Sequence, residues 1–271
     1  MTTVSSYSVS NTTGNLSVVD QRINSDILPV ELVGISVAKN EARAYGAVAS
    51  VCNTNATGGF MRAAFTTLAL LIDGPNGPFL VSPARNVLVG VGVKVQPFAF
   101  RYRTALGARG TDYLVDCHSS LRENLQLASS SNGSCSGAGC CRASLPETMP
   151  LTGVSVEMMP RKTTLNNSLW VTNPCSFAMV VEDSWYNFST ADLYGNTSNK
   201  LPRGVPYVID FAIRNAKCPA KGQQPPPDYA CVSGNSSCAD VTNGYVCKCL
   251  EHYEGNPYIP NGCQGNSVSV C

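Results

Sequence analysis

The sequence predicts a mainly β protein, made of disulfide-stapled antiparallel β modules followed by a small cysteine-rich domain. Three observations predict it. The 271 residues include 13 cysteines, and charged residues make up 14% of the chain where about 25% is usual. Runs of β-branched and aromatic residues are separated by clusters of Gly, Pro and Asn, which is typical of strands joined by turns. Many cysteines and a surface made polar by uncharged residues are typical of a secreted protein.

The strand signals lie in the middle of the chain. Residues 87–100 alternate Gly, Val and polar residues, and residues 177–181 and 205–213 are β-branched or aromatic runs, so we expect all three to be strands. Only residues 120–128 suggest a helix. The pair Gly90 and Gly92 has no third glycine after it, which favours a bulge over a phosphate-binding loop.

Several function classes are disfavoured by the sequence. The net charge of +1 is too balanced for a nucleic-acid partner, and the sequence has none of the kinase motifs. We expect no metal and no cofactor, since there is no Cys-x2-Cys pair and the two histidines, His118 and His252, lie in unrelated contexts. Residues 133–137, Gly-Ser-Cys-Ser-Gly, have the spacing of a nucleophile elbow with Cys135 in the nucleophile position. The many cysteines around Cys135 favour a disulfide instead. We therefore expect no enzymatic activity.

Glycosylation motifs are frequent. Eight Asn-x-Ser/Thr sequons predict a glycoprotein of the secretory pathway, at Asn11, Asn15, Asn55, Asn132, Asn166, Asn187, Asn196 and Asn235.

The ends of the chain do not match this compartment. Residues 1–20 have no basic start and no long apolar run, which does not fit a signal peptide. The longest apolar stretch, residues 63–72, is shorter than the roughly 20 residues that a membrane span needs. We expect the sequence to be part of a longer secreted or membrane-anchored product, or a gene model with a misplaced start; Cys271, the odd thirteenth cysteine, supports this.

Six cysteines lie close together near the C-terminus. From residue 218 onward large aliphatic residues are scarce, so this segment needs disulfides to fold. Cys247 and Cys249 are one residue apart in a predicted strand, so their side chains point to opposite faces and bond different partners. Residue spacing alone leaves fifteen pairings open. The six are Cys218, Cys231, Cys238, Cys247, Cys249 and Cys263.

With Gly255-Asn-Pro-Tyr258 before its last cysteine, the segment 218–263 resembles an epidermal growth factor-like (EGF-like) domain. The resemblance implies that Cys218 bonds Cys238, Cys231 bonds Cys247 and Cys249 bonds Cys263. Residues 214–217 lack the acidic pair that calcium requires, so no calcium is expected. Residues 264–271 look like the start of a second copy.

Motifs at residues 137–146, 173–185, 205–215, 229–231 and 255–258 follow one another along the chain. Together, and in this order, they resemble the ectodomain of plant wall-associated receptor kinases. The resemblance implies a galacturonan-binding-like module at 30–145 and the family's C-terminal-like β region at 146–217, after an unmatched segment 1–29. It implies a location outside the cell, at the cell-wall face of the plasma membrane, contact with pectin, and connection through a membrane span to a kinase.

This chain departs from the family pattern at its start, because residues 1–51 do not match the family's opening motif. Two family cysteines are also missing. An even set of cysteines remains upstream of residue 218, with its pairing open: Cys52, Cys117, Cys135, Cys140, Cys141 and Cys175.

Charge placement supplies the ligand candidates. Residues 42–110 hold seven basic residues against one acid, Asp73. Arginine binds a carboxylate bidentately and an aromatic face covers a sugar ring, so an acidic pectic polysaccharide, such as an oligogalacturonide, fits this segment. Strand alternation puts Arg101 and Arg103 on one side of a strand. This arrangement fits a ligand site and a solvent-exposed basic strand face equally well. The candidates are Arg85, Lys94, Arg101, Tyr102, Arg103 and Arg109.

Three interpretations follow from the sequence. The first is a non-catalytic extracellular fragment that binds pectin. The second is a soluble wall glycoprotein that acts through protein partners by its EGF-like domain. The third is a truncated gene product without function. We also expect Trp170 and Trp185 to pack against sheet rather than stack on a ligand.

Overall fold

The structure, a computed structural model, describes fourteen stretches of the chain, and all structural statements below concern them. They are residues 8–9, 16–18, 30–46, 48–52, 65–67, 77–105, 108–120, 133, 135–147, 151, 153–158, 175–194, 200–242 and 244–265. The expected helix at 120–128 lies outside them except for residue 120. Trp170 also lies outside them.

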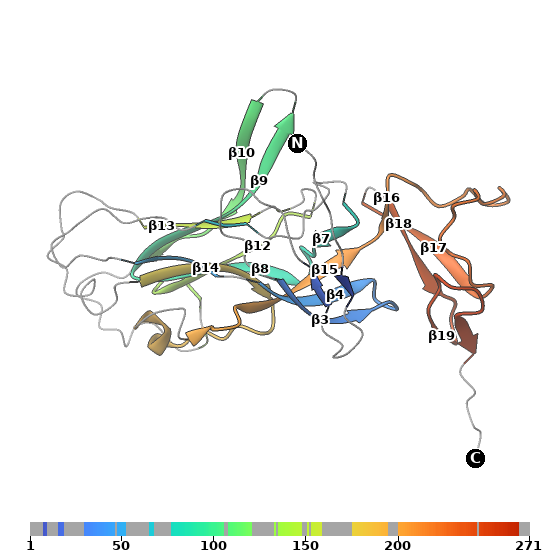
Figure 1. The fold of residues 1–271 in the computed structure, drawn as a ribbon. Helices are drawn as coiled ribbons and strands as arrows, with labels where there is room; N and C mark the ends of the chain where they lie inside the picture. The colour runs from blue at the N-terminus through green and yellow to red at the C-terminus, as the bar shows by residue number, and fades with distance from the viewer. Residues whose placement is uncertain are drawn as a thin grey trace, which may run out of the picture.

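The expectation of a mainly β fold is confirmed (Figure 1). A six-stranded sheet has the order β1 (Ser8–Val9), β2 (Leu16–Val18), β3 (Val30–Ser36), β4 (Glu41–Gly46), β15 (Val205–Phe211) and β7 (Phe79–Val81). A second sheet has the order β10 (Ala108–Asp116), β9 (Lys94–Ala105), β13 (Gly153–Met158) and β6 (Phe65–Thr67), and β11 (Ser119–Ser120) also pairs with β9. All described strand pairs in these sheets are antiparallel.

We call the four-stranded sheet the middle sheet, because its strands contact strands of both other large sheets. Its order is β12 (Cys140–Ser144), β8 (Asn86–Val91), β14 (Cys175–Glu182) and β5 (Ala49–Cys52). A short 3-10 helix, η3 (Thr190–Leu193), follows β14 and is capped by Ser189. Residues 213–265 include the segment 218–263, which we call the EGF-like segment after its cysteine pattern. They add β16 (Ile213–Arg214), β17 (Ser236–Val241), β18 (Gly244–Cys249), β19 (Tyr253–Gly255) and β20 (Cys263–Gly265).

Both faces of the middle sheet are covered, which explains the continuous apolar runs of its central strands. All six residues of β8 are buried. Leu88 belongs to one apolar cluster with Val180, while Val89 belongs to a second with Met179. Strands buried on both faces read as unbroken hydrophobic runs rather than as alternating ones. We call the three large sheets and their two apolar clusters the β body.

The β body combines strands from both halves of the chain. β15 lies between β4 and β7, and β14 lies between β8 and β5. The predicted regions 30–145 and 146–217 therefore supply strands to the same sheets, and no break between sheets falls at residue 145.

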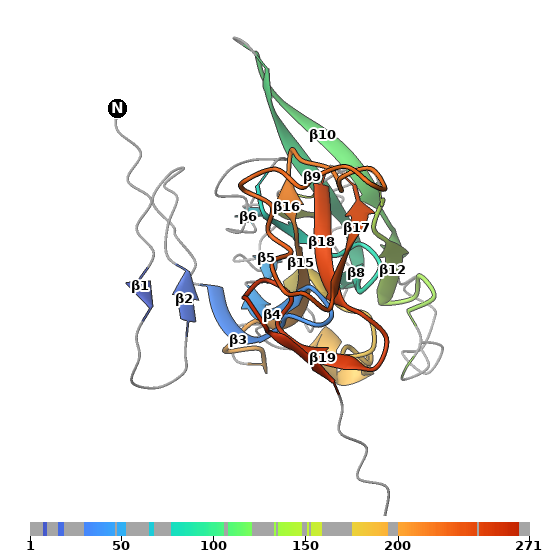
Figure 2. The same ribbon diagram turned by 90° about the vertical axis from the view of Figure 1, so that its right-hand side faces the viewer.

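The hairpin of β9 and β10 projects from the β body (Figures 1 and 2). β13 pairs with β9 only from Val95 to Phe100, whereas β10 continues the pairing to Ala105. The outer part of the hairpin is therefore a two-stranded ribbon standing clear of the sheet, and it carries several of the ligand candidates.

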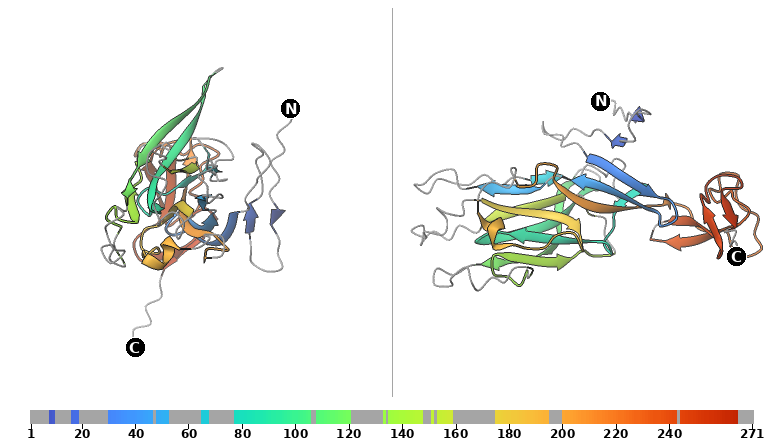
Figure 3. Two further views of the ribbon diagram at one scale, coloured as in Figure 1. Left: turned by 90° about the vertical axis from the view of Figure 1, so that its left-hand side faces the viewer. Right: turned by 90° about the horizontal axis from the view of Figure 1, so that it is seen from below.

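The EGF-like segment sits at one end of the elongated molecule (Figure 3), directly after β15. Ile213 in β16 already pairs with Tyr245 of β18. The Tyr258 hydroxyl donates a hydrogen bond of 2.7 Å to Asn40 Oδ1 in the turn between β3 and β4, and accepts one of 3.0 Å from the Cys247 N–H. The EGF-like segment is thus held on the β body by a strand pair and by side-chain contacts.

Candidate functional site

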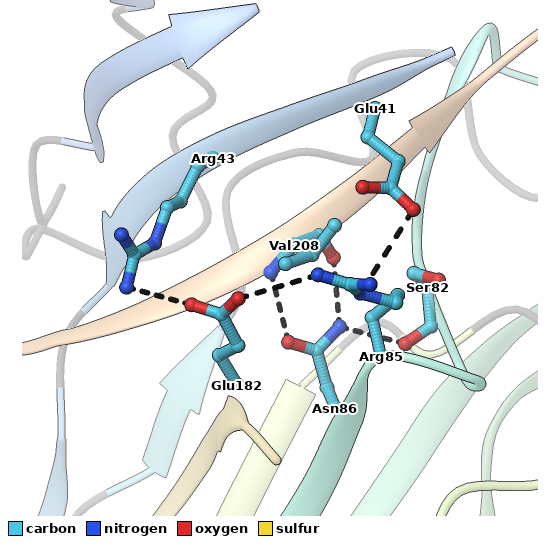
Figure 4. A network of polar contacts seen from close by, with 7 residues as sticks. All are labelled: Glu41, Arg43, Ser82, Arg85, Asn86, Glu182 and Val208. Carbon is cyan, nitrogen blue, oxygen red and sulfur yellow. Dashed lines mark hydrogen bonds and ion pairs between the residues drawn. The ribbon is translucent and has the colours of Figure 1, made fainter. Parts of the chain in front are cut away.

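Arg85 lies in a chain of ion pairs on the surface of the β body (Figure 4). Its Nη2 atom lies 3.5 Å from Glu182 Oε1, and its Nε atom lies 3.9 Å from Glu41 Oε1. Arg43 Nη2 lies 2.6 Å from the other oxygen of Glu182. An incoming carboxylate would have to compete with two acids for Arg85, which weakens it as a ligand candidate.

The neighbouring Asn86 has a structural role. Its Nδ2 group donates to the carbonyls of Ser82 at 2.6 Å and Val208 at 2.7 Å, and its Oδ1 accepts from the Val208 N–H at 2.8 Å (Figure 4). This buried amide satisfies backbone groups of β15 and of the turn before β8, at the place where the middle sheet meets the six-stranded sheet.

Arg101 is also paired within the chain. Its Nε and Nη2 atoms donate to Asp112 Oδ2 at 3.3 and 3.1 Å, and Asp112 lies directly opposite it in the register of β9 and β10. Both side chains are partly exposed, so the pair contributes little stability and its guanidinium stays accessible. Lys94, half-buried at the start of β9, lies opposite Ser120.

For Tyr102, Arg103 and Arg109 the structure gives the backbone position and not the side chain. In the register of the hairpin Arg103 lies opposite Gly110, and Arg109 lies opposite Thr104. Because successive strand positions alternate between faces, positions 101 and 103 share one face, and positions 102 and 109 share the other. The hairpin thus brings four candidates together, and Arg85 lies apart from them on the β body.

The acidic partners are what sequence reasoning missed. The basic segment 42–110 ends two positions before Asp112, and Glu41 and Glu182 are far from Arg85 in sequence. An antiparallel hairpin with its turn near residues 106–107 would have placed Asp112 opposite Arg101. No local signal pairs Arg85 with Glu182, because that contact requires the pairing of β8 with β14.

A pair of aromatic rings also lies on the hairpin, one half-buried and one exposed. The ring centroids of Phe98 and Tyr113 are 5.1 Å apart at an interplanar angle of 55°, and Tyr113 is 61% exposed. Next to this pair Gln96 Nε2 donates to Asp116 Oδ2 at 2.7 Å. These four side chains come from the base of β9 and β10.

The expectation that Trp185 packs against sheet is wrong. Trp185 lies in the turn that follows β14, where its N–H donates to the Glu182 carbonyl at 2.9 Å, and its side chain is 38% exposed. The β-branched run ends at Glu182, so the tryptophan falls past the strand and loses the cover of the sheet.

Twelve of the cysteines form disulfides. In the β body the bonds are Cys52–Cys175, Cys117–Cys141 and Cys135–Cys140, so Cys135 is not a free thiol. In the EGF-like segment they are Cys218–Cys238, Cys231–Cys247 and Cys249–Cys263, the same three pairs that the family resemblance implies.

Only two of the eight sequons lie in the described residues. Asn187 is exposed and Asn235 is half-buried, so the predicted glycosylation of Asn187 meets no steric obstacle from burial. The other sequons lie outside the described residues, at Asn11, Asn15, Asn55, Asn132, Asn166 and Asn196. Within the described stretches no three His, Cys, Asp or Glu side chains are arranged to hold a metal ion, and the absence of metal remains a prediction.

A half-buried acid, Asp210, lies near the junction of the β body with the EGF-like segment. Burial raises the pKa of Asp210, as does the charge of Glu41 opposite it in the register of β15 and β4. A hydrogen bond from Ser82 and the charges of Arg214 and Arg85 act in the opposite direction. The net direction shows that the charged form of Asp210 is poorly solvated here.

Comparison with known proteins shows homology to wall-associated receptor kinases of Arabidopsis thaliana. The chain is 39% identical to wall-associated receptor kinase 2 over 141 residues, which are 51% of this chain and 18% of that protein. It is 34% identical to wall-associated receptor kinase 1 over 142 residues, again 18% of that protein. Wall-associated receptor kinase-like 6 is 24% identical over 94% of this chain.

These findings confirm the resemblance inferred from the motifs. The chain spans only about a fifth of the length of the wall-associated receptor kinases it matches, and the homology supports a receptor-like extracellular module. No family model matches the chain, and no solved structure matches it. In the described part of the chain no helix has the length and apolar character needed to cross a bilayer.

Proposed function

We propose that this chain is a non-catalytic extracellular module that binds pectic polysaccharide through the β9–β10 hairpin of its β body. The observation that carries the proposal is the projecting hairpin, which places Arg101 and Arg103 on one face of a ribbon that stands clear of the sheet. A de-esterified galacturonan presents a carboxylate on each ring, and a guanidinium binds a carboxylate with two parallel hydrogen bonds. The kinase activity named for the homologues is not part of this proposal.

The ion pair of Arg101 with Asp112 gives the proposal a specific form. A bound carboxylate would exchange with the Asp112 carboxylate at Arg101, so Asp112 acts as a competitor of the ligand. Because the pair is partly exposed, it costs little to open. Arg103 lies opposite Gly110, where its cross-strand neighbour provides no acid.

The test is a set of charge variants of the purified, disulfide-intact protein. Arg101→Ala with Arg103→Ala removes two sites worth about 1.5 to 3 kcal/mol each before exposure reduces them, so binding of de-esterified homogalacturonan should fall measurably. Asp112→Asn removes the competitor and should strengthen binding. Binding should weaken with salt, since the screening length falls from about 10 Å at 0.1 M to about 3 Å at 1 M.

A matched control keeps the net charge change constant. Arg142 and Arg203 form exposed ion pairs elsewhere on the β body, with Asp183 and Glu31. The double variant Arg142→Ala, Arg203→Ala should bind as the unchanged protein does. Equal binding by both double variants, or equal binding of fully methyl-esterified pectin, would contradict the proposal.

A second function is supported by the EGF-like segment. Four large aliphatic side chains there are exposed, namely Val232, Val241, Leu250 and Ile259, and exposed apolar groups of this kind suit a protein partner. Under this alternative the chain acts as a wall glycoprotein through protein contacts. Changing these four side chains to serine separates the two functions. A variant that still binds pectin shows that pectin binding does not depend on this surface of the EGF-like segment.

A further inference from the structure

The base of the β9–β10 hairpin presents an aromatic surface that the charged candidates do not include. Phe98 and Tyr113 lie on adjacent strands with ring centroids 5.1 Å apart. Phe98 is half-buried and supports the pair, whereas Tyr113 is 61% exposed. An exposed tyrosine held in place by a second ring offers a rigid flat face at small conformational cost.

The hairpin register sets the position of this tyrosine. Tyr113 lies opposite Phe100 in β9, and Phe98 lies two residues from Phe100 on the same face of that strand. Diagonal neighbours across an antiparallel strand pair are within reach of aromatic side chains, which is how the ring of Tyr113 meets the ring of Phe98. The β-bulge follows directly, between Tyr113 and Val115.

Polar groups flank the rings. Gln96 and Asp116 are joined by a hydrogen bond of 2.7 Å and both remain accessible. A carboxylate has about four lone-pair positions and an amide has two N–H donors, so this pair retains acceptors and a donor after its own hydrogen bond. Donors and acceptors beside a flat apolar face match a sugar ring, which has an apolar face of C–H groups and hydroxyls at its rim.

We infer that Phe98 and Tyr113, with Gln96 and Asp116 beside them, form a stacking subsite for one pyranose ring of the bound polysaccharide. This inference rests on the proposed function and adds a second, uncharged contact to it. Two rings are far too small an area for a protein partner, which needs about 800 Å² on each side. Like-charge repulsion from Asp116 turns the carboxylate of the bound ring away from this residue, so the ring is held by its face and hydroxyls.

The two contacts differ in their response to salt. Stacking on Tyr113 is apolar and short-ranged, so its contribution should not change with ionic strength. The contribution of Arg101 and Arg103 should shrink as salt rises. In the hairpin register Tyr113 lies opposite Phe100, so by strand alternation it shares a face with positions 102 and 109, whereas positions 101 and 103 lie on the opposite face. Along β10 Tyr113 and the position of Arg109 are four residues apart, or roughly 14 Å at 3.4 Å per residue, so one extended oligosaccharide can reach both on one face. It reaches Arg101 and Arg103 by passing around the edge of the two-stranded ribbon.

The experiment measures the affinity of a de-esterified oligogalacturonide by calorimetry at low and raised salt. Tyr113→Ala should lower the affinity about tenfold at both salt concentrations, and Tyr113→Phe, which keeps the ring, should change it less than about twofold. The control is Tyr194→Ala, which removes another exposed tyrosine, at the end of η3, and should have no effect. The aromatic proton resonances of Tyr113 should shift on titration with the oligosaccharide.

Each result decides the matter. Unchanged binding by Tyr113→Ala, or an equal loss in Tyr194→Ala, overturns the stacking subsite and leaves the arginine-based function standing. A tenfold loss that vanishes at raised salt also overturns it, because the contact would then be electrostatic. If the unchanged protein binds no oligogalacturonide at all, both the proposed function and this subsite fall.

Discussion

The β body and the EGF-like segment are stabilised in different ways. In the β body a middle sheet is buried on both faces, and apolar side chains of β8 and β14 alternate between two large clusters. In the EGF-like segment the buried cluster consists of Cys231, Tyr245 and Cys247. A small domain buries too little apolar surface to fold on that basis, so cross-links replace the core.

The comparison also bears on function. In the β body the base of the β9–β10 hairpin contributes Val95 and Ala99 to the first apolar cluster, and the outer part of the hairpin extends from that anchored base. The EGF-like segment has only a small buried cluster. It is held together by three disulfides and is joined to the β body by the hydrogen bond from Tyr258 to Asn40. We therefore propose that the ligand site lies on the β body, to which the EGF-like segment is joined by the pairing of β16 with β18 and by the hydrogen bond from Tyr258 to Asn40.

The largest expected effect comes from removing a disulfide of the small segment. Cys231–Cys247 closes a loop with a sequence separation of 16, which is worth about 3 kcal/mol on the chain-entropy model. Cys231→Ser with Cys247→Ser should unfold the EGF-like segment and leave the β body folded. Hydrogen exchange should show loss of protection in residues 218–263 alone.

The matched change in the β body is Cys135→Ser with Cys140→Ser, whose bond has a sequence separation of only 5. Its removal should lower the thermal unfolding temperature and leave all three large sheets protected. Global unfolding of the β body by this variant would show that it depends on cross-links as the EGF-like segment does.

The next effect concerns the buried amide of the β body. Asn86→Ala removes three hydrogen bonds and leaves the buried Val208 N–H without its partner, while the Val208 carbonyl keeps its hydrogen bond from the Ser82 N–H. We expect a loss of about 3 kcal/mol in the free energy of unfolding, since each buried unsatisfied group costs about 1 to 3 kcal/mol. Denaturant unfolding measures it. Gln96→Ala, at an exposed amide, should stay within about 0.5 kcal/mol of the unchanged protein.

The smallest effect is a dependence on pH at the junction. Because the pKa of Asp210 is raised in the folded state, its contribution to stability is fully present below its ordinary value of 3.8 and is lost as pH rises through the raised value. Asp210→Asn, which stays neutral, should therefore gain stability relative to the unchanged protein between about pH 4 and pH 7. Thermal unfolding across this range measures the difference. A difference that is constant or falls with pH would contradict the burial of a charged Asp210.

Much of the fold could be predicted because its signals are local. The runs at 87–100, 177–181 and 205–213 correspond to β8 with β9, to β14 and to β15 with β16, since burial on both faces selects β-branched and aromatic residues. The interleaving of the sheets could not be predicted, because the pairing of β14 with β8 joins residues about ninety positions apart. A local pattern holds no information on such contacts.

The candidate site stays a prediction, and only part of its geometry could be read from the sequence. That positions 101 and 103 share one face follows from strand alternation alone. The partners Asp112 and Glu182, and the pair of Phe98 with Tyr113, depend on which strands pair and in which register. The exposure of Trp185 depends on where β14 ends, which is the least certain feature of any strand read from sequence.

The central claim is that ligand binding belongs to the β body and not to the EGF-like segment. Hydrogen exchange of the unchanged protein, with and without a de-esterified oligogalacturonide, tests it most directly. The account predicts slower exchange in residues 94–116 when the oligosaccharide is added, and no change in residues 218–263. Slower exchange in residues 218–263 with no change in residues 94–116 would contradict it.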